Sequence, residues 1–151
     1  ASDVYKRQGQ RGARIDLIVR GACMLAPQVP GVTDNIRVRS VIGRFLEHTR
    51  VFYFRAGGEE DLYLSSADWM NRNMMRRVEL AWPVTDPKLR QQIIDECLVA
   101  YLCDDRDAWT LNAAGVYDRA VHPVDGSGAQ NALMVRYGPR PALGREEPGV
   151  A

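Results

Sequence analysis

The sequence predicts a single domain of the α/β class, with an α+β arrangement as the alternative. Three observations lead to this prediction: short runs of β-branched and aromatic residues, one long amphipathic helical pattern, and clusters of turn residues that separate them. Of the 151 residues, 46% are apolar, which is enough for one hydrophobic core and too little for two well-filled ones.

Strands dominate the first half of the chain in this prediction. Residues 14–19 (RIDLIV) are β-rich, and residues 36–43 (IRVRSVIG) begin with the apolar–polar alternation of a half-exposed strand. Residues 26–35 between them carry two prolines, a glycine and an Asp-Asn pair, and therefore predict a loop. Further strands are expected at 50–54, 62–66 and 76–84, with the turn RAGGEED joining the first two of these as a hairpin.

Residues 87–102 carry the clearest helical pattern. Asp86 is a suitable N-cap, and Pro87 occupies the first helical position. Apolar residues recur at every fourth position, namely Leu89, Ile93, Cys97 and Tyr101, and make one stripe along the helix. Because Cys97 lies on that stripe, we interpret it as a core residue rather than a reactive thiol.

The residues after this helix predict a hairpin and then a tail. Residues 108–120 combine two strand-like runs with Gly115 in the turn between them. From His122 onward the chain is rich in Pro, Gly and Ser, with one short helical turn expected at 129–135. The predicted organisation is a polar leader foreign to the domain, or a fragment edge, at 1–13, one domain at 14–135 and a flexible tail at 136–151.

Charge and cysteine usage exclude several functional classes. The net charge of +1 argues against a nucleic-acid-binding protein that works by bulk charge. The three cysteines include no C-x-x-C pair, which argues against a disulfide framework or zinc site and fits a reducing compartment. The sequence contains no run of 18 apolar residues, so it predicts no membrane-spanning helix.

Arginine is concentrated between positions 14 and 55, and this suggests an anionic ligand. Seven arginines oppose three acidic residues there, a local excess of +4. The planar, two-pronged guanidinium suits phosphate or carboxylate recognition, although a codon bias toward arginine explains the same composition equally well.

Three features could form a site. Arg20 follows the strand at 14–19, and ligands of α/β sheets gather at the carboxyl ends of strands. His48 and Arg50 lie two positions apart, so in an extended segment both would face one side and could grip a phosphate. Residues 65–73 (SSADWMNRN) offer hydroxyl and amide groups that suit oxyanion contacts. By spacing alone, a lone histidine before a strand is more often structural than catalytic.

A short pattern in this region resembles a degraded phospholipase D signature, which reads His-x-Lys, a later Asp, and Gly-Ser-x-Asn. Here Arg50 stands in the place of the Lys and Arg55 in the place of the Asp. Ser65 replaces the Gly, and Asp68 replaces the Asn.

Longer sequence segments show a more specific resemblance. The segments IDLIVRGACML, PGVTDNIRVRSVIGRFLEHTRVFYF, YLSSADWMNRNMMRRVELAWPV and DDRDAWTLNAAGVYDR together resemble the C-terminal catalytic domain of bacterial polyphosphate kinase, over about residues 13–134. This resemblance implies a phospholipase D-like fold, in which a mixed sheet is flanked by helices. It also implies that the chain is a fragment of a larger enzyme, the second of two such domains.

The resemblance assigns roles to particular residues. Arg20, in IDLIVRG, falls on the family's nucleotide-phosphate-binding arginine, and His48, in RFLEH, falls on its second active-site histidine, which also binds nucleotide. Arg39, Arg44 and Arg50 are candidate phosphate contacts. The histidine that becomes phosphorylated and the ligands of Mg²⁺ are expected in the preceding domain, and His122 is a poor substitute for that nucleophile.

The activity implied is reversible transfer of the ATP γ-phosphate to inorganic polyphosphate through a phosphohistidine. The implied ligands and partners are ATP or ADP with Mg²⁺, polyphosphate, the upstream domains of the same enzyme and further copies of it. A cytoplasmic location is implied, with peripheral association at the inner membrane left open, and this chain alone is expected to be inactive. The alternatives are a phospholipase D-like phosphodiesterase half-site and a non-catalytic module for polyphosphate binding or assembly.

Overall fold

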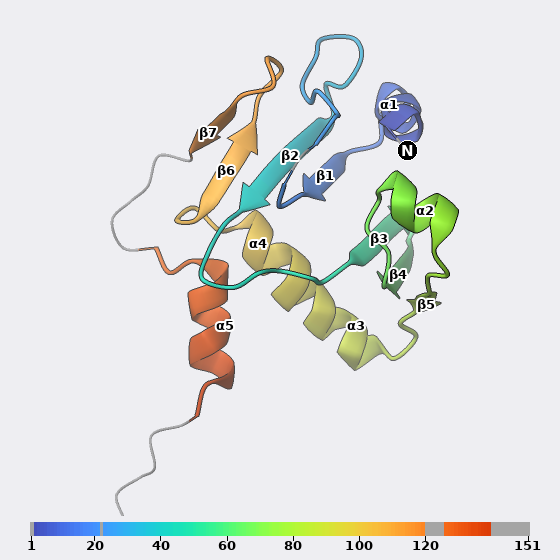
Figure 1. Ribbon diagram of the computed structural model, residues 1–151. Helices are drawn as coiled ribbons and strands as arrows, with labels where there is room; N and C mark the ends of the chain where they lie inside the picture. The colour runs from blue at the N-terminus through green and yellow to red at the C-terminus, as the bar shows by residue number, and fades with distance from the viewer. Residues whose placement is uncertain (1, 22, 120–125, 140–151) are drawn as a thin grey trace, which may run out of the picture.

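The strands form two sheets in this computed structural model, which describes residues 2–21, 23–119 and 126–139 (Figure 1). The first sheet has the order β1-β2-β6-β7, with bounds Ile15–Ile18, Ile36–Val41, Ala108–Leu111 and Tyr117–Arg119. The second has the order β3-β4-β5, with bounds Val51–Ala56, Glu59–Ser65 and Ala81–Pro83. Among the strands of the described residues, only β1 and β2 pair in parallel, and the other pairs are antiparallel. The predicted α/β class is confirmed, with the strands divided between a mixed and an antiparallel sheet.

The helices cover and connect these sheets. Their bounds are Ser2–Gln10 (α1), Asn71–Arg76 (α2), Pro87–Ile93 (α3), Ala100–Leu102 (α4) and Ala129–Tyr137 (α5). A π-helical segment, η1 (Ile94–Val99), joins α3 to α4, so that the predicted helix at 87–102 is one continuous rod. Figure 1 shows this rod between the two sheets, with α5 beside its α4 end.

The first sheet has a core on each face. One face carries Ile36 and Val38 of β2, both fully buried, with Leu25 and Leu111. Helix α1 adds Tyr5 to this cluster, and a Cβ on Gly9 would lie 3.3 Å from a side-chain carbon of Ile36. The other face is covered by the rod and by α5, and its cluster consists of Val41, Tyr101, Ala108 and Ala129. Both ends of β2 are therefore fixed by packing.

Several local predictions are confirmed. The carboxylate of Asp86 accepts hydrogen bonds from the backbone N–H groups of Lys88 (2.8 Å) and Leu89 (2.9 Å), as an N-cap should. The β3–β4 and β6–β7 hairpins form as expected, and Gly115 has a φ of 81° in the second turn. The prediction for Cys97 is confirmed only in part. The residue is half-buried and lies outside both core clusters, but this burial raises the pKa of its thiol, which disfavours the reactive thiolate.

Three elements differ in extent or in type from the prediction. The strand expected at 76–84 is reduced to β5, because Arg76 ends helix α2 and pairing with β4 begins only at Ala81. The leader contains helix α1, whose Tyr5 packs on the core, so tertiary contact stabilises a polar segment that has no strong pattern of its own. The helical segment expected at 129–135 is confirmed as α5, which has nine residues and continues to Tyr137.

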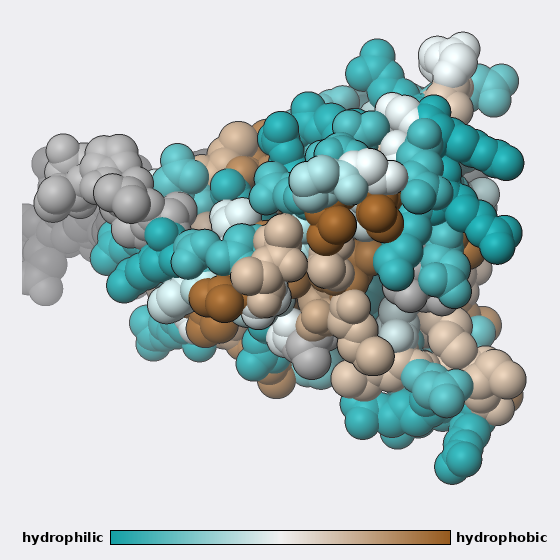
Figure 2. Space-filling view, turned by 90° about the horizontal axis from the view of Figure 1, so that it is seen from above, coloured by the Kyte–Doolittle hydropathy of each residue, from teal (hydrophilic) through white to brown (hydrophobic). Residues whose placement is uncertain are grey.

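The surface combines charged and apolar side chains. Exposed apolar residues are concentrated on α2 and the segment after it, among them Met70, Met74, Met75, Val78 and Leu80. Figure 2 shows apolar side chains gathered among polar ones on the face seen from above. Among the helices of residues 2–21, 23–119 and 126–139, none has the length and hydrophobicity needed to cross a bilayer.

Candidate functional site

Arg20 lies immediately beyond the carboxyl end of β1. The N–H of Val19 still donates to the carbonyl of Arg39 on β2, at 2.8 Å, and the buried hydroxyl of Ser40 then donates to the carbonyl of Arg20, at 3.0 Å. The backbone of Arg20 is thus held against β2, while its side chain is exposed. This is the strand-end position that the sequence predicted, and it leaves the guanidinium accessible to a ligand.

His48 lies in the segment that leaves the same end of β2. Residues 42–50 have no regular secondary structure before β3 begins, and the side chain of His48 is exposed. The carbonyl of His48 accepts a 3.0 Å hydrogen bond from Nη1 of Arg50. Because β1 and β2 are parallel neighbours, Arg20 and the segment carrying His48 both start from one edge of the first sheet.

Arg50 contacts protein groups. Its Nε donates to Oδ1 of Asp68 at 2.8 Å, in an ion pair whose side chains are 23% and 44% exposed. The hydrogen bond from Arg50 lowers the pKa of the Asp68 carboxyl, and the positive charge of Arg72 adds a smaller contribution. The guanidinium of Arg50 therefore ties the backbone of His48 to the loop that follows β4.

The polar groups of residues 65–73 also bond internally. The hydroxyls of Ser65 and Ser66 donate to the carbonyl of Leu80 and the carboxylate of Glu79. The buried Asn73 donates to the same carboxylate at 2.7 Å. These groups were expected to suit oxyanion contacts. In the structure they instead bond to Glu79 and Leu80 and so hold together the segment that connects β4 to β5.

Two further arginines singled out in the sequence lie in different environments. Nη1 of Arg39 donates to the carbonyls of Leu102 (2.6 Å) and Asp104 (2.8 Å), at the end of α4. The guanidinium of Arg44 lies 5.8 Å from the ring centroid of Phe45, and Arg44 is exposed. The side chain of Arg44 can therefore bind an external anion, whereas that of Arg39 is already hydrogen-bonded to carbonyls at the helix terminus.

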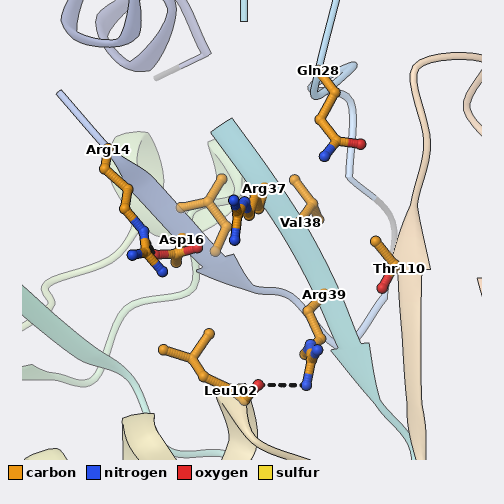
Figure 3. A pocket seen from close by; sticks show the side chains of 9 residues that line it. Arg14, Asp16, Gln28, Arg37, Val38, Arg39, Leu102 and Thr110 are labelled. Atoms are coloured by element: carbon orange, nitrogen blue, oxygen red, sulfur yellow. Dashed lines mark hydrogen bonds and ion pairs between the residues drawn. The ribbon is translucent and has the colours of Figure 1, made fainter. Parts of the chain in front are cut away.

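A shallow depression on the first sheet adds little free positive charge (Figure 3). Its lining includes Arg14, Arg37 and Arg39, but Nε of Arg14 is paired with Asp16 at 2.8 Å. Of these three arginines, only Arg37 has no hydrogen bond or ion pair to the described residues. Neither Arg20 nor His48 lines the depression, so it does not coincide with the site predicted from the sequence.

The described residues contain no group of three or more His, Cys, Asp or Glu side chains that could hold a metal ion. His122 lies outside the described residues.

Comparison with known proteins identifies the relatives of this chain. The family model described as polyphosphate kinase C-terminal domain 2 matches residues 3–131. The polyphosphate kinase of Burkholderia cenocepacia strain HI2424 is 50% identical over 128 residues, which cover 85% of this chain and 19% of that protein. The polyphosphate kinase of Paraburkholderia phytofirmans strain PsJN is 49% identical over the same shares.

A solved structure agrees with these sequence matches. The crystal structure of polyphosphate kinase from Porphyromonas gingivalis superposes with a TM-score of 0.80 at 40% sequence identity. The match covers 90% of this chain and 21% of that chain. The chain therefore spans about a fifth of the length of the proteins it resembles.

Proposed function

Because this chain belongs to the polyphosphate kinase C-terminal domain 2 family, we propose that it supplies part of the active site of an ATP-dependent polyphosphate kinase. The observation that carries this proposal is the 50% identity over 128 residues to a protein of that name. The position of Arg20 at a strand end, with an accessible side chain, supports it. The proposed reaction is reversible transfer of the γ-phosphoryl group of ATP to the end of a polyphosphate chain.

Arg20 has the properties of a nucleotide-phosphate ligand. Its carbonyl is fixed by Ser40, so the exposed side chain starts from a defined point beside β2. A guanidinium can donate two parallel hydrogen bonds to phosphate oxygens and neutralise charge that spreads over them during transfer. In this role Arg20 binds and orients the phosphates of ATP or ADP.

His48 has the properties of a proton donor and acceptor. Its imidazole is exposed, while its carbonyl is bound by Arg50. Imidazole can exchange a proton near neutral pH, and it can also donate to a phosphate oxygen as negative charge develops there. In this role His48 assists from the side opposite the nucleophile.

The nucleophile is proposed to be a histidine of a preceding domain. Its ring nitrogen forms a bond to the γ-phosphorus as the bond from that phosphorus to the β,γ-bridging oxygen breaks, which releases ADP. A terminal oxygen of polyphosphate then forms a bond to the same phosphorus, and the N–P bond breaks. The ligands of the Mg²⁺ that would accompany ATP are also proposed to lie elsewhere in the enzyme. We propose a cytoplasmic homo-oligomer as its working form.

The phosphodiesterase alternative is less well supported. In that reading, Arg50 would replace the lysine of the phospholipase D signature and contact phosphate. The guanidinium of Arg50 instead donates to Asp68 and to the carbonyl of His48. A non-catalytic binding module would also use Arg20. In that case, replacing His48 would leave the turnover of the full-length enzyme unchanged, whereas the kinase role requires it to fall.

The test is His48→Ala in the full-length protein that carries this segment. Transfer of labelled γ-phosphate from ATP into polyphosphate should fall by about 10²–10³-fold, the usual cost of one charge-assisted contact in such a site. Thr49→Ala is the matched control, since Thr49 is the exposed neighbour of His48. The control should retain activity, and both proteins should keep the wild-type circular dichroism spectrum. Wild-type synthesis by His48→Ala would contradict the catalytic assignment.

A further inference from the structure

Helix α5 holds the segment that precedes His48 through one buried side chain. The N–H of Phe45 donates to Oε1 of Gln130 at 2.8 Å, and Nε2 of Gln130 donates back to the carbonyl of Phe45 at 2.9 Å. One amide thus satisfies both backbone groups of Phe45, as a neighbouring strand would. Gln130 is only 4% exposed, so these hydrogen bonds are shielded from water.

The same amide also fixes the side chain next to His48. Nε2 of Gln130 donates to Oε1 of Glu47 at 2.8 Å, and the hydroxyl of Tyr101 donates to the same oxygen. Burial of Tyr101, together with its bond to Glu47, raises the pKa of the phenol and keeps it a donor. The carboxylate of Glu47 is therefore held inward against α4 and α5, while His48, the next residue, is exposed.

The local packing leaves the Gln130 amide little freedom to move. A Cβ on Gly43 would lie 2.4 Å from Oε1 of Gln130, so this glycine gives the room in which the amide sits. The first N–H of α5, from Ala129, donates to Oδ2 of Asp104 at 2.7 Å, and Asp104 is itself buried. The position of Gln130 is thus fixed by the start of α5 and by its neighbours.

On these contacts, and on the proposed function, we propose that Gln130 is a positioning residue for His48. Its amide fixes the backbone of Phe45 and the carboxylate of Glu47, and through them it sets where the imidazole lies during phosphoryl transfer. Arg50 fixes the other side of His48 by binding its carbonyl. A displacement of about 1 Å in a reacting group can cost 10²-fold in rate, so a residue that touches no substrate can control turnover.

The test is Gln130→Glu in the full-length protein. The new carboxylate can accept from Phe45 but cannot donate to its carbonyl, and it repels Glu47. We expect kcat to fall about 10- to 100-fold, with little change in KM for ATP, because the lost alignment matters in the transition state. Adding Glu47→Gln should restore part of kcat, since the amide introduced at position 47 can donate to the carboxylate introduced at position 130, while the carbonyl of Phe45 still lacks its donor.

Asn131→Asp is the matched control, since it makes the same amide-to-carboxylate change on the exposed neighbouring residue of α5. It should leave kcat unchanged. Wild-type kcat in Gln130→Glu would overturn the proposal. So would a loss that Glu47→Gln leaves unrepaired, because Gln130 would then serve only the stability of the fold.

If Gln130→Glu does not fold, Gly43→Ala provides the second test, since its methyl group displaces the Gln130 amide without removing any polar group. It should also lower kcat with KM for ATP nearly unchanged, and wild-type kcat would overturn the proposal. Failure of the proposed function is distinguishable, because it would appear as full activity in His48→Ala. Failure of this inference alone would leave His48→Ala inactive and Gln130→Glu active.

Discussion

Nη1 of Arg39 donates to the carbonyl of Leu102 at 2.6 Å, which joins the middle of β2 to the last residue of α4 across 63 positions of the chain. Further bonds to the carbonyls of Tyr101 and Asp104 complete the contact. The final carbonyls of a helix have no partners within the helix, and a cation there also opposes the negative end of the helix dipole. Arg39 therefore joins the first sheet to the helical rod.

Replacement of Arg39 should affect stability. Arg39→Met keeps the aliphatic stem but removes the donors, and we expect the free energy of unfolding to fall by about 2–3 kcal/mol. Arg37→Met, at an exposed arginine two residues away on the same face of β2, is the control and should stay within about 0.5 kcal/mol of wild type. Denaturant titration measures both. Equal effects of the two substitutions would show that the helix-terminal contact contributes nothing.

Replacement of Arg20 should affect activity rather than stability, because its side chain is exposed and, within the described residues, only its backbone carbonyl is hydrogen-bonded, by Ser40. Arg20→Ala in the full-length protein should lower polyphosphate synthesis by about 10²–10³-fold while leaving the thermal midpoint unchanged. Arg20→Lys should recover only part of the loss, because an ammonium group lacks the forked geometry of guanidinium. Arg55→Ala, an exposed arginine on the β3–β4 hairpin, is the control. Full activity in Arg20→Ala would rule out its proposed role.

The ion pair between Arg50 and Asp68 should make stability depend on acid pH. The pKa of Asp68 is lowered in the folded state, so its contribution is complete above the unfolded pKa of about 3.9 and disappears as pH falls through the folded pKa. The pair is partly exposed, so the expected contribution is at most about 1 kcal/mol.

Asp68→Asn should remove this component. Unfolding measured between neutral pH and about pH 3 should show a smaller acid loss of stability for Asp68→Asn than for wild type. Asp61→Asn, at an exposed aspartate with no hydrogen bond to the described residues, should keep the wild-type profile. Parallel acid profiles for wild type and Asp68→Asn would contradict a stabilising pair.

The N-cap of α3 offers a prediction about local structure. Asp86→Ala removes the acceptor for two backbone N–H groups and should cost about 1 kcal/mol of stability, whereas Asp86→Ser should retain most of the cap. Thermal unfolding compares the two variants. An equal loss in both would show that the hydrogen bonds from Lys88 and Leu89 do not stabilise the helix.

The sequence identified the elements whose signals are local. The N-cap at Asp86 and the turn at Gly115 formed as predicted, because each depends on residues within one or two turns of the chain. Helix α1 was missed because its polar sequence gains stability from the packing of Tyr5, which is a tertiary effect. The division of the strands into two sheets was missed as well, because strand patterns do not state which strands pair.

At the candidate site, too, local sequence patterns predicted some features, and others depended on tertiary contacts. By itself, the sequence determined the strand end that carries Arg20, the resemblance in RFLEH that singled out His48, and the family of the chain. Only the tertiary structure decided that Arg39 binds a helix terminus. It also decided that Arg50 binds Asp68, and that Gln130 holds the segment before His48 from 85 positions away. Local patterns record the conformation of neighbouring residues, whereas the partner of a buried amide or guanidinium is set by which distant segments the folded core brings together.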